Sequence, residues 1–126
     1  MLTNLKDVDV KTLAEVYDKH NEDSFISLYL NFADTHIIKK RKQACRAALK
    51  FKKNMLVNFD KTMESIEEYL RTEQREQGQH GVIIFASHVN SFFKAYKPPV
   101  SVESQLVVDT SPYIKPLMQL LDEYES

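Results

Sequence analysis

Short apolar segments with a period of two residues predict four β-strands in this chain. In the first segment, Leu28 and Leu30 share one face and Tyr29 lies on the other. Apolar side chains on both faces are typical of a central strand that is covered on both sides. The four predicted strands are residues 25–32, 82–86, 91–96 and 105–108.

Four longer segments have the 3.6-residue period of helices and cover about residues 7–20, 36–54, 60–77 and 114–124. In the second of these, the apolar positions predict a stripe that faces the core and includes Cys45, Leu49 and Phe51. The element order αβααβββα therefore predicts one α+β domain over residues 1–126. In this domain a mostly antiparallel four-stranded sheet is packed between helices.

The composition is that of an ordinary globular protein. The chain has 126 residues, of which 43% are hydrophobic and 28% charged. Cys45 is the single cysteine, so no intrachain disulfide can form and a reducing compartment is favoured. No apolar run approaches the roughly 20 residues that span a bilayer, and the first residues lack the pattern of a signal peptide. We therefore expect a cytoplasmic protein that does not enter a membrane.

Residues that could support catalysis are scattered. With Gly78 and Gly81 as the only glycines, a glycine-rich phosphate loop is excluded. The four histidines do not occur at metal-ligand spacing, which argues against a zinc site. Cys45 is expected to be a buried structural thiol, and His80 and His88 to be exposed turn residues rather than parts of a site. We expect no enzymatic activity, no cofactor and no small-molecule ligand in this chain.

The charges are segregated although the net charge is only −1. Residues 36–56 contain eight lysines or arginines and no acid, whereas residues 60–76 contain six acids and three bases. A helix over 36–54 would place several of these bases on one face, where they could contact nucleic-acid phosphates. The candidate RNA-binding residues are Lys39, Lys40, Lys42, Arg46, Lys50, Lys52, Lys53 and Asn54.

Two other interpretations of this basic segment stay open. A surface helix needs a polar face, and Lys and Arg are good helix formers. The acidic segment that follows could also neutralise part of the basic face. The alternative function is therefore a protein-interaction or oligomerisation module, in which the basic helix binds an acidic partner.

Several segments resemble one known family. They are Asp23–Leu30, Gly81–Ser87, Pro98–Val100 and the closing stretch Leu106–Tyr124 with its Tyr113-Ile114-Lys115-Pro116-Leu117. Over roughly residues 20–126 the chain resembles the N-terminal domain of archaeal and eukaryotic class I peptide-chain release factors. It is especially similar to the release-factor-like proteins of bacteria and archaea.

The resemblance implies a ribosome-bound domain that acts in translation. In the family, peptidyl-tRNA hydrolysis belongs to a separate domain with a Gly-Gly-Gln loop, which this sequence lacks. We therefore expect a non-catalytic domain of a longer protein, with the ribosome, its RNA and the C-terminal domains of the same chain as partners. The family's Asn-Ile-Lys-Ser corner falls by position at residues 52–58, which read Lys-Lys-Asn-Met-Leu-Val-Asn. This difference favours ribosome rescue or quality control over stop-codon decoding.

Overall fold

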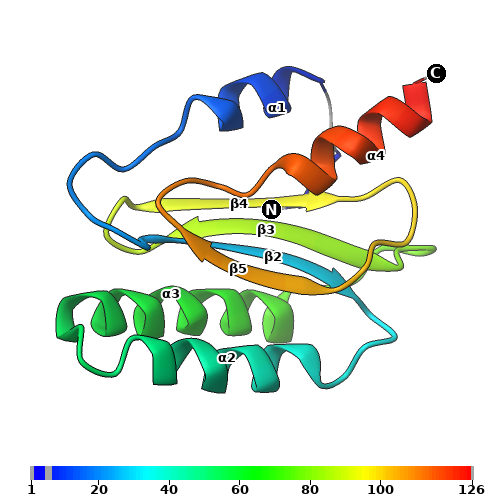
Figure 1. The fold of residues 1–126 in the computed structure, drawn as a ribbon. Helices are drawn as coiled ribbons and strands as arrows, with labels where there is room; N and C mark the ends of the chain where they lie inside the picture. Colours follow the sequence, from blue (N-terminus) through cyan, green and yellow to red (C-terminus); the bar gives the residue numbers. More distant parts are fainter. Residues whose placement is uncertain (1, 5–6, 126) are drawn as a thin grey trace.

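The computed structural model describes residues 2–4 and 7–125. A single sheet lies between two pairs of helices (Figure 1). Its strands are β1 (Leu2–Asn4), β2 (Phe25–Asn31), β3 (Gly81–Ser87), β4 (Phe92–Lys97) and β5 (Gln105–Asp109). The helices are α1 (Asp7–Ala14), α2 (Ile37–Ala48), α3 (Lys53–Thr72) and α4 (Lys115–Glu125). The predicted α+β class and the order αβααβββα are confirmed.

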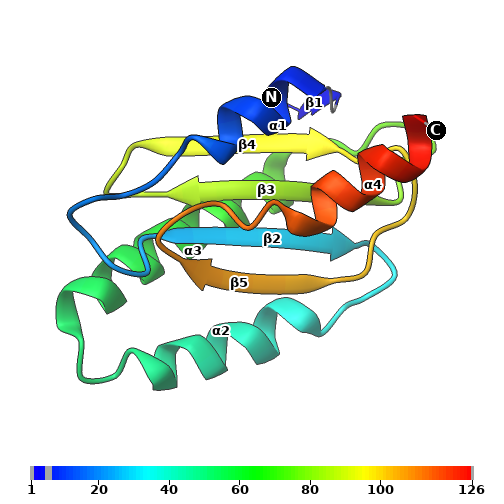
Figure 2. The ribbon, with the colours of Figure 1, turned by 45° about the horizontal axis from the view of Figure 1, so that its top comes forward.

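The strand order in the sheet is β1-β4-β3-β2-β5. Strands β2 to β5 are antiparallel to their neighbours, and β1 adds a short parallel pairing to β4 that the sequence analysis did not predict. Helices α1 and α4 cover one face, and α2 and α3 cover the other (Figures 1 and 2). Two helical layers on one sheet give the chain two separate apolar cores.

Strand β2 is central and covered on both faces, as its sequence predicts. It pairs with β3 on one side and β5 on the other, so that Leu28 lies opposite both Ile84 and Leu106. Leu28 faces the core beneath α2 and α3, whereas Tyr29 faces the core beneath α1 and α4. This strand therefore links the two apolar cores.

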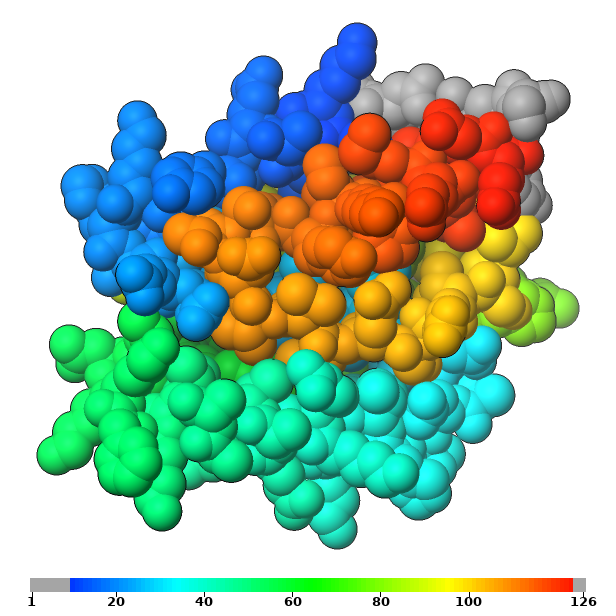
Figure 3. Space-filling model, viewed as in Figure 1, coloured from blue at the N-terminus to red at the C-terminus, as the bar shows by residue number. Residues whose placement is uncertain are grey.

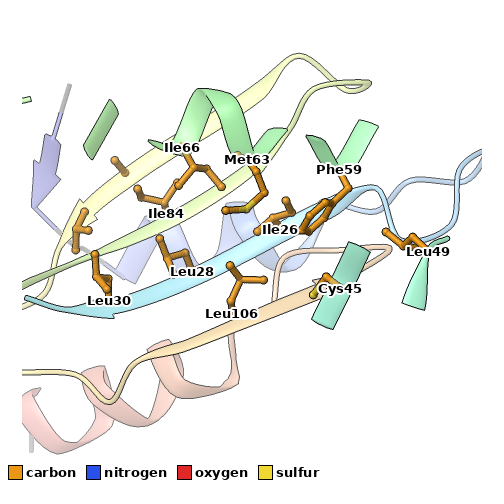
Figure 4. Packing of buried hydrophobic residues seen from close by; sticks show 13 residues of the cluster. Ile26, Leu28, Leu30, Cys45, Leu49, Phe59, Met63, Ile66, Ile84 and Leu106 are labelled. Carbon is orange, nitrogen blue, oxygen red and sulfur yellow. The ribbon is translucent and has the colours of Figure 1, made fainter. Parts of the chain in front are cut away.

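The larger core lies between the sheet and the α2–α3 layer (Figure 4). Phe59, Met63 and Ile66 project from α3 at intervals of four and three residues, so they share one side of the helix and are all buried. Cys45 and Leu49 enter the same cluster from the α2 side. Burial of each large side chain contributes about 1.5–3 kcal/mol as an upper estimate.

The boundary between α2 and α3 differs from the expected one. We expected α2 to run to about residue 54, but it ends at Ala48, and the chain turns at residues 49–52. Leu49 is buried at the start of this turn, and Lys52 has the non-helical angles φ −115° and ψ 76°. No glycine or proline marks the turn. The break is set by packing, because α3 can cover the sheet only if the chain reverses here.

Two helices end earlier than predicted, although α3 also begins earlier, at Lys53 instead of near residue 60. Helix α1 ends at Ala14 instead of near residue 20, and Tyr17 lies exposed beyond it. Helix α3 ends at Thr72 instead of near residue 77, because the chain becomes extended at Glu73 (φ −79°, ψ 132°). Beyond Ala14 the apolar spacing continues through Val16 and Tyr17, whereas residues 73–77 contain no apolar side chain.

Candidate nucleic-acid interface

The eight basic residues of the segment 36–56 do not lie on one helix face. Lys42 and Arg46 point toward α3, which runs antiparallel beside α2. The Lys42 ammonium lies 3.2 Å from a carboxylate oxygen of Glu67, and the Arg46 guanidinium is hydrogen-bonded to Asp60. This hydrogen bond and the charge of Asp60 raise the pKa of Arg46. The acidic helix therefore neutralises the centre of the basic segment.

The basic residues near the start of α2 also differ in their surroundings, because one is hydrogen-bonded to the sheet and two are exposed. Arg41 donates to the backbone carbonyl oxygen of Leu106 at 3.3 Å, which occupies an acceptor on the edge strand β5. Lys39 and Lys40 are exposed in the first turns of the helix. They lie at the opposite end of α2 from the turn that leads into α3 (Figure 2).

The remaining bases gather at that turn, with an aromatic side chain among them. We call residues 50–54 the basic-aromatic tip; they are Lys50, Phe51, Lys52, Lys53 and Asn54, and all five are exposed. Within the described part of the chain, no carboxylate forms an ion pair with any of the three lysines. The tip belongs to the segment that projects at the lower left of the molecule in Figure 3.

The expectation that one helix over residues 36–54 places several bases on one face is therefore wrong for Lys50 and Lys53. Helix α2 ends before Lys50, and Lys53 is the first residue of α3. Phe51 was also expected in the core, whereas 91% of this residue is exposed. A sequence signal for this site exists in the run Lys-Phe-Lys-Lys, because an aromatic residue between cations is typical of surfaces that bind single-stranded nucleic acid.

The start of α3 adds to the positive potential of the tip. Its N-cap residue, Lys52, makes no side-chain capping hydrogen bond, and the first turn contains no acidic residue. The first N–H groups of an α-helix have no partner within the helix, and they carry the positive end of the helix dipole. At this helix start those groups lie beside the lysine side chains of the tip, which suits an anion such as phosphate.

Asn58 fixes the tip to the rest of the molecule. Its side-chain nitrogen donates to the carbonyl of Ser24 at 3.0 Å, and its side-chain oxygen accepts from the backbone N–H of Val89 at 2.8 Å. One turn later, Thr62 accepts from the backbone N–H of His88 at 3.0 Å. These bonds connect α3 to the segment before β2 and to the β3–β4 turn.

A groove of about 500 Å³ opens beside the tip, between these three segments. Asn54, Met55 and Asn58 line it from α3, Val89 lines it from the β3–β4 turn, and residues 20–22 and 24 complete its wall. Polar and half-buried apolar groups therefore lie next to the lysines. The groove is large enough to accommodate part of a polymer that follows the tip.

A buried carboxylate orders the wall of this groove. Asp18 accepts hydrogen bonds from the backbone N–H groups of His20 and Asn21, each at 2.9 Å, and from the Asn90 side chain at 2.8 Å. Burial alone would raise the pKa of Asp18, but these hydrogen bonds, with that of Asn90 the largest, lower it well below its usual range. The network joins residues 18–24 to the β3–β4 turn.

The residues considered for catalysis are not brought together. Cys45 is buried, and burial raises the pKa of its thiol, which disfavours the reactive thiolate. His80 and His88 are exposed and flank opposite ends of β3. Among residues 2–4 and 7–125, no group of His, Cys, Asp or Glu side chains could hold a metal ion.

None of the described helices is both long enough and apolar enough to cross a membrane. No family model matches this chain, and no curated protein matches it. Among solved structures, it is similar to one described as "Archaeal protein", with a TM-score of 0.58 and 14% identity. The match covers 100% of this chain and 37% of that one, so this chain spans less than half the length of the protein it resembles. This similarity supports the fold alone.

Proposed function

We propose that this chain is a non-catalytic RNA-binding domain of a release-factor-like protein, and that it contacts ribosomal RNA through the basic-aromatic tip. The observation that carries the proposal is the set of exposed lysines Lys50, Lys52 and Lys53, which no carboxylate neutralises within the described residues. The tip projects from an uncapped helix start, so backbone and side-chain charges favour the same anionic ligand.

The charge pattern in α2 and α3 favours the tip, rather than the rest of the basic segment, as the RNA-binding surface. Lys42 and Arg46 are paired with acids of α3, and such pairs have little charge left for a phosphate. The lysines of the tip have no such partner within the described residues. Binding through them would be largely independent of nucleotide sequence, because contacts to phosphates position a protein without reading bases.

The resemblance to release factors supports a role in translation. The segments that carry it, Asp23–Leu30 and Gly81–Ser87, include the neighbouring strands β2 and β3 at the centre of the sheet. The family's decoding motif lies at the corner between two long helices, and the tip occupies the corresponding corner here. Because the tip has a different sequence, we propose a function in ribosome rescue or quality control, in the cytoplasm, rather than stop-codon decoding.

The test is co-sedimentation with ribosomal subunits. The tip variant carries Lys50→Gln, Lys52→Gln and Lys53→Gln. The matched control carries the same change at Lys11, Lys94 and Lys115, which are exposed on α1, β4 and α4. We expect the tip variant to lose most of its binding and the control to bind like the wild type.

Two outcomes would contradict the proposal. If both triple variants lose binding equally, net charge rather than the tip is responsible. If wild-type protein fails to bind subunits yet captures an acidic protein through the same lysines, the chain is a protein-interaction module.

A further inference from the structure

Phe51 is placed where an apolar side chain gains nothing from folding. It is 91% exposed, whereas Phe59, eight residues later on the same helical hairpin, is 1% exposed. Leaving a phenylalanine in water forfeits about 1.5–3 kcal/mol of burial free energy. An isolated exposed apolar residue alone would need no explanation, but this one lies among three lysines at a helix corner.

We infer that Phe51 is a stacking platform for an unpaired base, so that the tip binds single-stranded RNA in preference to a duplex. This inference rests on the proposed function, because it names the form of RNA that the tip would bind. The lysines before and after the ring would contact the phosphates of the nucleotide that stacks on it. Backbone contacts combined with base stacking are the general way in which proteins bind single strands without reading their sequence.

The geometry of the tip supports this assignment. The ammonium of Lys50 lies 5.5 Å from the centroid of the Phe51 ring, within the range of a cation–π contact. With 91% of the residue exposed, much of the ring surface stays open to a ligand. Because Lys50 lies over one face of the ring, a base would stack on the opposite face. Stacking on a single aromatic side chain contributes about 1–3 kcal/mol per base.

The surroundings of Phe51 favour a single strand over the other ligands that an exposed ring could bind. In a duplex the base faces are covered by their neighbours, so the ring could reach only edges and backbone. In protein interfaces, energetically dominant aromatic residues usually lie within a desolvated, well-packed patch. Here the residues adjoining Phe51 at the tip are exposed and polar: Lys50, Lys52, Lys53 and Asn54.

The absence of tryptophan from the sequence gives a direct spectroscopic test. Phe51→Trp introduces a single indole at the tip, and Met118→Trp introduces one on α4, where Met118 is 49% exposed. Each variant is titrated with an unstructured RNA about 12 nucleotides long, within the usual site size of single-strand binders. The same strand annealed to its complement is the duplex ligand.

We expect the single strand to quench the fluorescence of the Phe51→Trp variant strongly and that of the Met118→Trp variant weakly. We also expect Phe51→Ala and Phe51→Leu to weaken single-strand binding by about 5- to 150-fold, the equivalent of one stacked base. Leucine keeps an apolar side chain but offers no ring, so it separates stacking from simple hydrophobic contact. Duplex binding should change by less than about twofold.

The results separate this inference from the proposed function. If Phe51→Ala binds single strands like the wild type while the tip lysine variant does not, the stacking inference is wrong and RNA binding by the tip stands. If wild-type protein binds neither RNA, the proposed function fails as well. A blue shift of the Phe51→Trp variant with phosphatidylserine vesicles, without quenching by RNA, would overturn the inference in favour of a membrane surface.

Discussion

Asn58 donates a 3.0 Å hydrogen bond to the backbone carbonyl of Ser24, a residue 34 positions earlier in the chain. Ser24 is buried immediately before the central strand β2, and Asn58 lies near the start of α3. The bond therefore connects the basic-aromatic tip to the buried start of β2. The position of the lysines depends on this contact as well as on apolar packing.

Replacing Asn58 should loosen this end of the molecule. Asn58→Ala leaves the carbonyl of Ser24 and the N–H of Val89 without their partners, so we expect the unfolding free energy to fall by about 1–3 kcal/mol. Ser65→Ala is the matched control, because its hydroxyl bonds only within α3 at an exposed position. It should change the free energy by less than about 0.5 kcal/mol in urea denaturation. Equal effects of both substitutions would contradict the bridging role of Asn58.

The buried carboxylate of Asp18 should make stability depend on acid pH. Its folded pKa lies below the unfolded value of about 3.9, so the ionised form stabilises the fold above that pH. This contribution is lost as the pH falls toward the folded pKa. We expect wild-type stability to decrease on acidification from pH 5, and Asp18→Asn to be less stable at pH 7 with a weaker acid dependence. Asp122→Asn, at an exposed position in α4, should retain the wild-type pH profile.

If the stability of Asp18→Asn falls with acid as steeply as that of the wild type, carboxylates other than Asp18 cause the acid dependence. Denaturation by urea between about pH 3 and pH 7, followed by circular dichroism, measures both profiles. The slope of unfolding free energy against pH is the quantity to compare.

Truncating the two phenylalanines of the helical hairpin should change stability by very different amounts. Phe59→Ala removes a buried ring and should lower the unfolding free energy by about 3–5 kcal/mol. Phe51→Ala removes a ring from solvent and should change it by less than about 0.5 kcal/mol. A large loss of stability for Phe51→Ala would show that the ring is packed in solution and would contradict the exposed tip.

Gly81 is required where β3 passes close to the end of β2. A Cβ atom at this position would overlap the backbone carbonyl oxygen of Leu30, which has no freedom to move within the sheet. Gly81→Ala should therefore cost about 1–3 kcal/mol of stability, measured by thermal or urea unfolding. Gly78→Asn is the control, since the site is open and asparagine tolerates its positive φ of 78°. Comparable losses for both would rule out the overlap as the cause.

The sequence was sufficient to predict the elements whose pattern is local. The alternation in β2 and the apolar spacing of Met63, Ile66 and Leu70 follow from two regular periods, and both are present in the structure. Strand β1 has only three residues and pairs with β4, more than 90 residues away, which no local pattern records. Such long-range pairing depends on the complete sheet.

The candidate site was only partly predictable for a related reason. Eight bases without an acid drew attention to residues 36–56, but whether these bases share a face depends on where α2 ends. The segment Leu49–Lys52 lacks glycine and proline, so its sequence does not show that the chain turns there. Once the turn is known, Arg46 lies beside Asp60, and Phe51 lies in solvent. Tertiary packing therefore decides which of the basic side chains stay free of acidic partners and could contact a ligand.

The most direct test of the tip as an RNA-binding surface is the salt dependence of binding to a single-stranded RNA. Each phosphate contact on a single strand contributes about −0.7 to the slope of log Kobs against log salt concentration. The variant with Lys50→Gln, Lys52→Gln and Lys53→Gln should therefore bind more weakly, with a slope shallower by about 2. The Lys11, Lys94 and Lys115 variant should keep the wild-type slope. Identical slopes and affinities for the wild type and the tip variant would contradict the account.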